Sequence, residues 1–223
     1  YAHGVDYHWT LDKRLQKSVK RTADALEAAR STVPQFRRYL DTGPVLERQW
    51  AAAAGLGWLA KNTLLIHPEL GSWFFLAIIF TSEPPPPAAR LDRVPDRCGS
   101  CTACLDACPT GALDATGLDA RKCLSYWTIE AREKHEPELL ADPSTAQGWW
   151  FGCDICQQVC PWNRKAPTVD DPAFEPHPDF EDLTPDRFAQ LSEEAFRARF
   201  RRTPLWRPRQ RKLTATLRLI TRG

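Results

Sequence analysis

The stretch Cys98-Gly-Ser-Cys101-Thr-Ala-Cys104-Leu-Asp-Ala-Cys108-Pro109 decides how this chain folds. A second run, Cys153-Asp-Ile-Cys156-Gln-Gln-Val-Cys160-Pro161, repeats its Cys-x-x-Cys and Cys-Pro elements, and Cys123 lies between the two runs. Together these positions account for all eight cysteines of the chain. Thiols at such close spacing predict that bound metal holds this segment together.

The spacing of the cysteines predicts two four-iron clusters. In the bacterial ferredoxin pattern, three closely spaced cysteines bind one cluster, and a fourth cysteine directly before a proline binds the other cluster. We therefore expect one [4Fe-4S] cluster to be bound by Cys98, Cys101, Cys104 and Cys160. The second cluster is expected to be bound by Cys108, Cys123, Cys153 and Cys156. This crossed ligation ties both ends of the segment together through metal, so loss of the clusters should unfold it.

Zinc sites and disulfide bonds are the alternatives for these cysteines. Zinc favours isolated pairs of ligands with four ligands per site, which fits the two runs less well. Disulfide frameworks are typical of short secreted chains. This chain has 223 residues and no recognisable signal peptide, so neither alternative is favoured.

Composition indicates an ordinary globular chain with a net charge of only +2. No stretch reaches the roughly 18 apolar residues of a membrane span, and the apolar residues 72–81 are expected to form a buried strand. We expect no membrane partner, a monomeric state and, because clusters and reduced thiols favour it, a cytoplasmic location. The chain contains no methionine, so we expect it to begin inside a longer protein.

We expect an α+β fold in three parts. Residues 1–94 are expected to form a mixed α/β part, residues 95–165 a ferredoxin-like double-cluster domain, and residues 166–223 an acidic linker followed by a basic helical tail. In the first part, apolar periodicity predicts a helix over residues 11–29 capped by Thr10, and a helix over residues 45–54 ended by Gly55.

Two strands and one further helix follow from local signals. Residues 64–66 and 73–80 are expected to pair as a hairpin through residues 67–71. In the third part, Thr184 is expected to cap a short helix that has Pro185 at its first position.

Asp41, in Asp41-Thr-Gly-Pro44, has three interpretations. An aspartate before such a sequence commonly caps a helix or stabilises a turn. Asp-Thr-Gly also occurs in aspartic proteases, which require a second aspartate. The third interpretation is a proton donor beside a redox centre, because a partly buried carboxyl group with a raised pKa can protonate a leaving oxygen.

The glycine-rich stretch Gly55-Leu-Gly57-Trp-Leu-Ala-Lys61-Asn62-Thr63 has two interpretations. It either ends a helix in a turn or brings the backbone close to a flat ligand, with Lys61 and Asn62 as polar contacts.

The C-terminal tail is basic and interleaved with Phe196, Phe200 and Trp206. It is either a solvated helix face or a surface that holds RNA phosphates and unstacked bases. The arginines concerned include Arg207, Arg209 and Arg211, and Arg132 and Lys134 form a second basic cluster.

With these motifs in view, the chain resembles the epoxyqueuosine reductases from Tyr1 to about Arg211. Its most specific segments, beyond the two cysteine runs, are Asp41-Thr-Gly-Pro-Val-Leu-Glu-Arg48, Gly55-Leu-Gly-Trp-Leu-Ala-Lys-Asn-Thr63, Cys123-Leu-Ser-Tyr-Trp-Thr-Ile-Glu130 and Gly152-Cys-Asp-Ile-Cys-Gln-Gln-Val-Cys-Pro-Trp-Asn163. A ferredoxin would match only the cysteines. The N-terminal part and the helical-repeat C-terminal domain of longer family members lie outside this chain.

The resemblance implies an oxidoreductase that reduces the epoxide of epoxyqueuosine in the wobble position of tRNA to queuosine. Its cofactors would be two [4Fe-4S] clusters and cobalamin, and its partners would be the tRNA and an unidentified electron donor. Asp41 would be the catalytic proton donor. The residues implied to face the corrin are Asp41, Lys61, Asn62, Thr63, Leu65 and Ser125, and those implied to meet tRNA include Arg132 and Lys134.

His8 is expected to make a structural polar contact. Asp6-Tyr7-His8 resembles part of the corrinoid-ligating pattern Asp-x-His-x-x-Gly, but Leu11 occupies the position of the glycine. His8 is therefore not expected to be a cobalt ligand.

Two rival functions share some of these features. A corrinoid reductive dehalogenase has similar cofactors but typically carries an export signal and an apolar substrate pocket, whereas this chain has a basic tail. A two-cluster ferredoxin-type electron carrier would depend on neither Asp41 nor the Lys61 segment.

Overall fold

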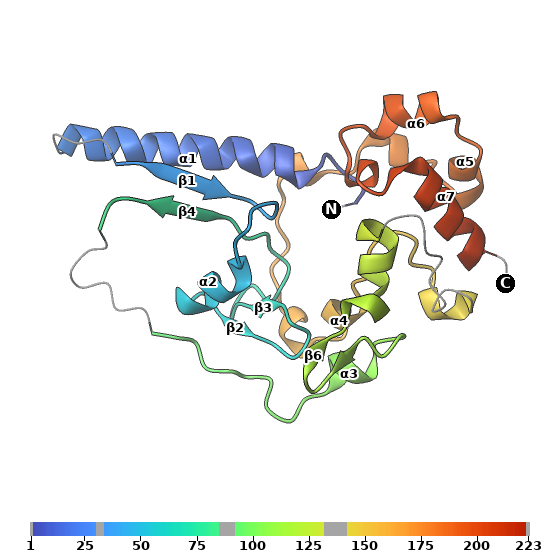
Figure 1. Cartoon of the computed structure of the whole chain (residues 1–223), viewed down its shortest axis with the longest axis horizontal. Coiled ribbons are helices and arrows are strands. Elements are labelled where there is room, and N and C mark those ends of the chain that lie inside the picture. Colours follow the sequence, from blue (N-terminus) through green and yellow to red (C-terminus); the bar gives the residue numbers. More distant parts are fainter. Residues whose placement is uncertain (1, 30–33, 85–91, 132–141, 222–223) are drawn as a thin grey trace.

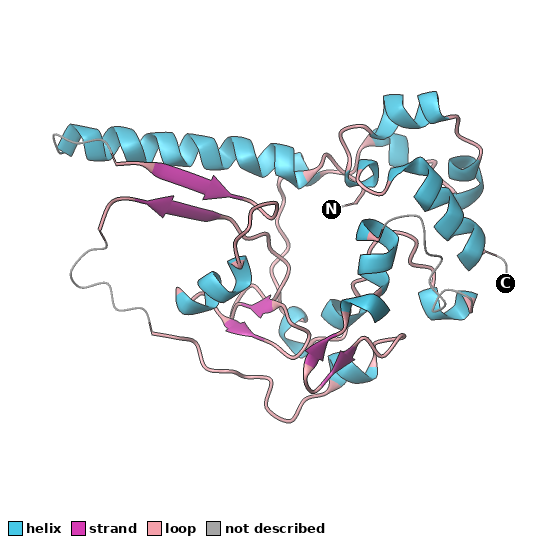
Figure 2. Cartoon of the chain, in the orientation of Figure 1, coloured by secondary structure: helices cyan, strands magenta, loops and turns pink. Residues whose placement is uncertain are grey.

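The computed structural model describes residues 2–29, 34–84, 92–131 and 142–221, apart from the side chain of residue 179. Helices dominate, and the strands of the described part form three small antiparallel sheets of two strands each (Figure 2). The expected mixture of helix and sheet is therefore confirmed. No helix among the described residues is long and apolar enough to cross a membrane.

The N-terminal part combines a long helix with two separate strand pairs. Helix α1 (Tyr7–Ala29) runs along the ribbon of β1 (Phe36–Tyr39) and β4 (Ile78–Thr81), as Figure 1 shows. An ion pair of 2.9 Å between Arg38 Nε and Asp12 Oδ1 links β1 to this helix. After β1 come α2 (Glu47–Ala53), β2 (Trp58–Leu59) and β3 (Leu65–Ile66), and the last two pair with each other.

Three expectations for this part were wrong. Thr10 lies inside α1, which begins three residues earlier, so it is not the cap. The expected hairpin does not form, because β3 pairs with β2 and β4 pairs with β1. Strand β4 is also largely exposed rather than buried.

The two glycines of the glycine-rich stretch have structural explanations. Gly55 has a φ of +75° and lies just beyond the end of α2, as expected for a helix-ending turn. A side chain at Gly57 would clash with the carbonyl oxygen of Ile66 on the neighbouring strand. Gly57 therefore allows the backbones of β2 and β3 to approach each other closely. The interpretation that this stretch brings its backbone close to a flat ligand was wrong.

The cysteine segment consists of short elements connected by turns. Its elements are α3 (Ala103–Asp106), β5 (Leu113–Asp114), β6 (Gly117–Leu118), η1 (Ala120–Lys122), η2 (Tyr126–Glu130), η4 (Pro143–Ala146), α4 (Ile155–Gln158) and η5 (Pro161–Asn163).

The cysteine segment packs directly on the N-terminal part. Trp58 and Ile66 share a small apolar cluster with Cys160 and Trp162. The amide oxygen of Asn163 accepts a hydrogen bond of 2.7 Å from the backbone N–H of Ser72. These contacts fix the strand pair β2–β3 against the second cysteine run.

The C-terminal part is helical and contains the largest apolar core. Its elements are η6 (Pro172–Phe174), η7 (Pro178–Phe180), α5 (Pro185–Ala189), α6 (Glu193–Phe200), η8 (Pro204–Trp206) and α7 (Arg209–Ile220). The expected cap is confirmed, because Thr184 Oγ1 accepts a hydrogen bond of 3.2 Å from the N–H of Arg187.

Phe196 and Phe200 belong to this core and are almost fully buried, so the idea that they stack on RNA bases was wrong. They pack with Phe188, Leu213 and Leu217 and also reach Ile129 and Phe151 of the cysteine segment. The helical part is therefore joined to the cysteine segment by a continuous apolar core.

We predict that Phe200→Ala lowers the free energy of unfolding by about 3–5 kcal/mol, because it leaves a cavity in this core. Denaturant unfolding followed by circular dichroism measures the loss. Val169→Ala is the control, since Val169 is 80% exposed and should change the stability by less than about 0.5 kcal/mol. Equal stability of both variants would contradict the assigned core.

Candidate active site

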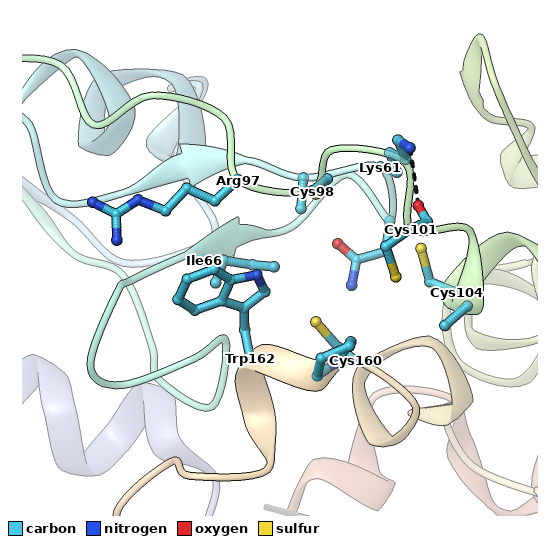
Figure 3. A pocket seen from close by; sticks show the side chains of 12 residues that line it. Lys61, Ile66, Arg97, Cys98, Cys101, Cys104, Cys160 and Trp162 are labelled. Atoms are coloured by element: carbon cyan, nitrogen blue, oxygen red, sulfur yellow. Dashed lines mark hydrogen bonds between the residues drawn. The ribbon is translucent and has the colours of Figure 1, made fainter.

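The first group of thiols lines a cavity of about 190 Å³. Its cysteines are Cys98, Cys101, Cys104 and Cys160. Figure 3 shows the sulfur atoms of Cys101, Cys104 and Cys160 turned towards a common space, with Trp162 beside them. Cys160 is buried and comes from the second run, whereas Cys101 is exposed at the surface.

The second group of thiols lines a cavity of about 340 Å³. Its cysteines are Cys108, Cys123, Cys153 and Cys156. The chain thus exchanges one cysteine between its two runs, in the crossed arrangement that the spacing predicts. Each cavity receives four thiols.

The number of thiols at each cavity bears on the choice between zinc and an iron–sulfur cluster. Within the described residues, no three His, Cys, Asp or Glu side chains are close enough to share one ion. A zinc ion would draw four sulfur atoms to within about 2.3 Å of itself. Four separated thiols around a cavity fit a multi-iron cluster better than zinc.

Burial and the repulsion between neighbouring negative charges change the pKa values of these thiols. Burial, followed by the charges of Cys153 and Asp154, raises the pKa of Cys156 to about 12. Burial also raises the pKa of Cys108, but hydrogen bonds from Thr110 and from neighbouring backbone N–H groups outweigh it and lower that pKa overall. Thiolates that repel one another in a confined space are stabilised by a cationic group between them, which iron supplies.

Asn62 lines both thiol cavities. It is 4% exposed, and its side-chain nitrogen donates a hydrogen bond of 3.4 Å to the carbonyl oxygen of Cys156. Its Oδ1 accepts a hydrogen bond from the N–H of Leu64, which shapes the turn between β2 and β3. Thr63, next in this turn, has a φ of +64° and receives a hydrogen bond from Arg48 on its carbonyl oxygen.

Lys61 lies at the first thiol cavity. Its Nζ donates a hydrogen bond of 2.9 Å to the carbonyl oxygen of Cys101 (Figure 3). It donates another, of 2.7 Å, to the carbonyl oxygen of Gly99. These bonds hold the loop between the first two cysteines. The sequence resemblance assigns Lys61 to the corrin, but the cavities that contain Asp41 and Ser125 do not include it.

A third cavity, of about 360 Å³, contains Asp41 and Leu65. It shares Arg48 and Leu64 with the second thiol cavity, whose walls include Thr63 and Ser125. Five of the expected corrin-facing residues, all but Lys61, therefore lie along two adjoining cavities. We call the third one the Asp41 cavity.

Three side chains from two distant segments, the start of α1 and the C-terminal part, lie next to the carboxylate of Asp41. Its Oδ2 accepts a hydrogen bond of 2.8 Å from Tyr7 Oη and lies 3.3 Å from His8 Nε2. A guanidinium nitrogen of Arg207 lies 3.7 Å from the same oxygen. Asp41 itself has a φ of +59°, a conformation that costs a non-glycine residue about 1–3 kcal/mol.

The expected raised pKa of Asp41 was wrong. The hydrogen bond with His8 lowers its pKa to about 2, with further lowering by Tyr7 and Arg207, although burial acts in the opposite direction. Asp41 is therefore a carboxylate at neutral pH. The Asp6-Tyr7-His8 motif is visible in the sequence, but no local signal indicates that its side chains contact Asp41.

The fourth cavity is a wide groove of about 1490 Å³ that borders this cluster at His8 and Arg207. It includes His8 and basic side chains from two distant segments, among them Arg37, Arg201 and Arg202. Trp9, 58% exposed, and Trp206 also line it. We call this cavity the basic groove.

The structure places the expected RNA-binding residues in different surroundings. Arg207 lies in the basic groove but is paired with Glu130 at 2.8 Å, and Arg209 stacks on Trp206 at 3.9 Å. Arg211 is exposed on α7. Arg132 and Lys134 lie outside the described residues.

Comparison with known proteins identifies the cysteine segment first. The family model described as a 4Fe-4S double cluster binding domain matches residues 97–163. The chain therefore carries an iron–sulfur domain of that kind.

Curated relatives match almost the whole chain. An epoxyqueuosine reductase of Cyclobacterium marinum is 39% identical over 93% of this chain and 63% of its own length. Those of Gloeobacter violaceus and Pseudomonas aeruginosa are 43% and 40% identical, over 88% and 93% of this chain and 60% and 55% of their own. The resemblance found from the motifs is confirmed, and the chain spans less than two thirds of the length of these relatives.

Solved structures of epoxyqueuosine reductases also match almost the whole chain. A selenomethionine-labelled epoxyqueuosine reductase matches 98% of this chain and 56% of its own, with 30% identity and a TM-score of 0.82. An epoxyqueuosine reductase with an epoxyqueuosine-modified tRNA-Tyr stem loop matches 98% and 55%, with 30% identity and a TM-score of 0.79. A third, from Bacillus subtilis with a catalytic aspartate loop swung out of the active site, matches 98% and 55%, with 29% identity and a TM-score of 0.78.

We predict that Lys61→Met lowers the reduction potential of the cluster nearest Cys101 and leaves the other cluster unchanged. Loss of a positive charge at this distance destabilises the reduced, more negative cluster. A redox titration followed by electron paramagnetic resonance measures both potentials.

Two controls separate charge from loop geometry. Lys61→Arg keeps the charge and should keep the potential, and Lys165→Met removes an exposed lysine beyond the second run and should change neither cluster. A Lys61→Met protein with the original potential would exclude this electrostatic role.

Proposed function

We propose that this chain, as a relative of the epoxyqueuosine reductases, contributes the part of such an enzyme that reduces the epoxide of epoxyqueuosine in tRNA to give queuosine. The observation that carries the proposal is the position of Asp41. It lies in a cavity that adjoins the second thiol cavity on one side, and its hydrogen-bond partner His8 faces the basic groove on the other. Electrons and a bound nucleotide can therefore meet at one carboxylate.

The two thiol cavities would hold two [4Fe-4S] clusters, bound in the crossed arrangement. Asn62 is packed between them, so the clusters would be close neighbours with little solvent between them. The reaction consumes electrons that the chain does not itself generate. An external electron donor must therefore reduce the cluster at the exposed Cys101.

Cobalamin would lie along the Asp41 cavity and the adjoining wall of the second thiol cavity. An unpaired polar atom supports this site: within the described residues, Glu47 Oε1 is buried at the Asp41 cavity without a hydrogen-bond partner. Such atoms are rare in folded proteins and are satisfied by a donor from a bound group. The strained backbones of Asp41 and Thr63 also fall at this site.

The residues that would hold cobalamin are Asp41, Asn62, Thr63, Leu65 and Ser125, and Lys61 is omitted because both its hydrogen bonds hold the cysteine loop. When bound, cobalamin supplies a metal that exchanges electrons with both the clusters and the substrate. The chain's own side chains position the epoxide and move protons. Asp41 Oδ2, fixed by Tyr7 and His8, would be the atom that passes a proton to the departing oxygen.

The tRNA would enter through the basic groove. Exposed Trp9 offers a stacking surface for an unpaired base, and Arg37, Arg201 and Arg202 offer charge for phosphates. Arg207 would contribute less than the sequence indicated, because its charge is shared with Glu130 and Asp41.

We predict that Asp41→Asn lowers kcat by about 10²- to 10⁴-fold, since it removes the group that passes the proton, and leaves cluster and cobalamin content unchanged. Turnover of epoxyqueuosine-containing tRNA under anaerobic conditions measures the effect. Asp170→Asn, at an exposed loop position, is the matched control with full activity. An Asp41→Asn enzyme with normal turnover would favour a ferredoxin-type electron carrier or a different donor.

We also predict that the double change Arg37→Gln and Arg202→Gln weakens tRNA binding and flattens its salt dependence. The slope of log K against log salt should fall by roughly 0.7 for each phosphate that the protein no longer neutralises. Fluorescence anisotropy with a labelled stem loop at several salt concentrations measures the slope. Arg21→Gln, on an exposed face of α1, should leave the slope unchanged, and an unchanged slope in the double variant would move the RNA site elsewhere.

A further inference from the structure

The proposed reaction needs more protons than Asp41 can carry. Removal of an epoxide oxygen as water breaks two C–O bonds, forms one C=C bond, and consumes two electrons and two protons. A single carboxyl group stores one proton at most, and Asp41 is ionised at neutral pH. The site therefore needs a second group that holds a proton and touches Asp41.

Tyr7 and His8 both meet these conditions, since Tyr7 Oη donates a hydrogen bond of 2.8 Å to Asp41 Oδ2. Of the two, His8 is the one that also lines the basic groove. It lies in the first turn of α1, with Nε2 3.3 Å from Asp41 Oδ2 and Nδ1 2.7 Å from Asp6 Oδ1. Because Asp6 holds one ring nitrogen, the other faces Asp41, and a guanidinium nitrogen of Arg207 lies at the same distance of 3.3 Å from it. The ring of Tyr7 lies against the imidazole, with 4.1 Å between ring centroids.

Asp6 is fixed as firmly as the histidine that it orients. Its N–H donates a hydrogen bond of 2.8 Å to the carbonyl oxygen of Arg202, and its carboxylate also accepts one of 3.0 Å from the N–H of His8. Asp6 thus has a structural role at the start of α1. A role in starting the helix does not account for the second contact, between His8 and Asp41.

The charges around His8 favour its protonated form. Hydrogen bonds with Asp41 and then Asp6 raise the pKa of His8 to about 9, against opposing contributions from burial and from Arg207. The other charged group nearby is Glu130, which is paired with Arg207. At neutral pH His8 is an imidazolium next to a carboxylate.

His8 also has access to a proton supply. Its side chain is 19% exposed and lines the basic groove, whereas Asp41 lines the cavity on the electron side. The pair thus spans the boundary between the groove and the reaction site. A proton lost from His8 can be replaced from water in the groove.

We propose that His8 is a proton-relay residue that passes the proton on Nε2 to Asp41 Oδ2, from which it reaches the departing epoxide oxygen. The step forms an O–H bond on Asp41 and leaves His8 neutral until water in the groove protonates it again. Two such passages deliver both protons of the product water. The relay rests on the proposed function, and His8 acts through Asp41 as a positioning residue.

The first test measures the proton on His8 without turnover. Deuterium exchange at the imidazole C2 position, followed by mass spectrometry of the cluster-loaded protein, gives a pKa for each histidine. We expect a pKa near 9 for His8 and a clear fall towards the ordinary value in Asp41→Asn. A His8 pKa near 6.5 in the unmodified protein, or no change in Asp41→Asn, overturns the shared proton.

The second test measures turnover against pH. His8→Gln can still hydrogen bond to Asp41 but carries no charge. We expect the unmodified enzyme to lose activity as pH rises through about 9, when His8 loses its proton. We expect His8→Gln to lower kcat about 10²-fold with unchanged KM and to abolish this alkaline loss of activity. His177→Gln, at a histidine that lines a different cavity, is the control, and it should keep the original kcat and the original loss of activity at alkaline pH.

The outcomes separate the relay from the proposed function. A His8→Gln enzyme that keeps the alkaline loss of activity overturns the relay and leaves the epoxide reduction intact. A protein whose His8 and Asp41 share a proton but which never reduces epoxyqueuosine overturns the proposed function instead. Unchanged cluster absorbance and melting temperature in His8→Gln exclude misfolding as the cause of a slow variant.

Discussion

The exchange of cysteines between the two runs is the constraint on which the rest of the structure depends. Cys160 joins the thiols of the first run and Cys108 joins those of the second, so neither cavity is complete without the other run. The turn that contains Asn62 is packed between the two cavities, and Trp58 and Ile66 pack against Cys160. Metal bound there fixes the strand pair β2–β3, and that pair positions Thr63 and Leu65 at the adjoining cavities.

In the proposed function, this arrangement of cavities would let electrons and protons reach Asp41 by separate routes. The exposed Cys101 marks one end of a series of cavities, and the Asp41 cavity lies beyond the second group of thiols. The basic groove is lined by His8 and by the neighbours Leu40 and Thr42 of Asp41, so it borders the same carboxylate. Arg207 connects the two sides, because it pairs with Glu130 of the cysteine segment and lies near Asp41. The helical C-terminal part thereby contributes directly to the charge of the site.

The sequence predicted what depends on local spacing and missed what depends on distant partners. The grouping of eight thiols follows from intervals of two or three residues, and the Thr184 cap follows from a single turn. The pairing of β1 with β4 joins segments far apart in the chain, so the local hairpin signal between residues 64 and 80 was misleading. The low pKa of Asp41 likewise depends on Tyr7, His8 and Arg207, which no motif around Asp41 reveals.

An ionised Asp41 in the resting site has a chemical advantage. A proton on a carboxyl group beside a strongly reducing centre is easily lost to that centre, whereas a proton on His8 is held one hydrogen bond away. Asp41 is 50% exposed before a substrate is bound, and water stabilises the charges of the Asp41–His8 pair. A nucleotide that covers the pair removes this water, and burial disfavours the charged forms of both groups. In the proposed relay, the proton would then move from the imidazolium to the carboxylate, because the neutral pair is better suited to the low dielectric. Binding of the substrate would itself convert Asp41 into the acid that the reaction requires.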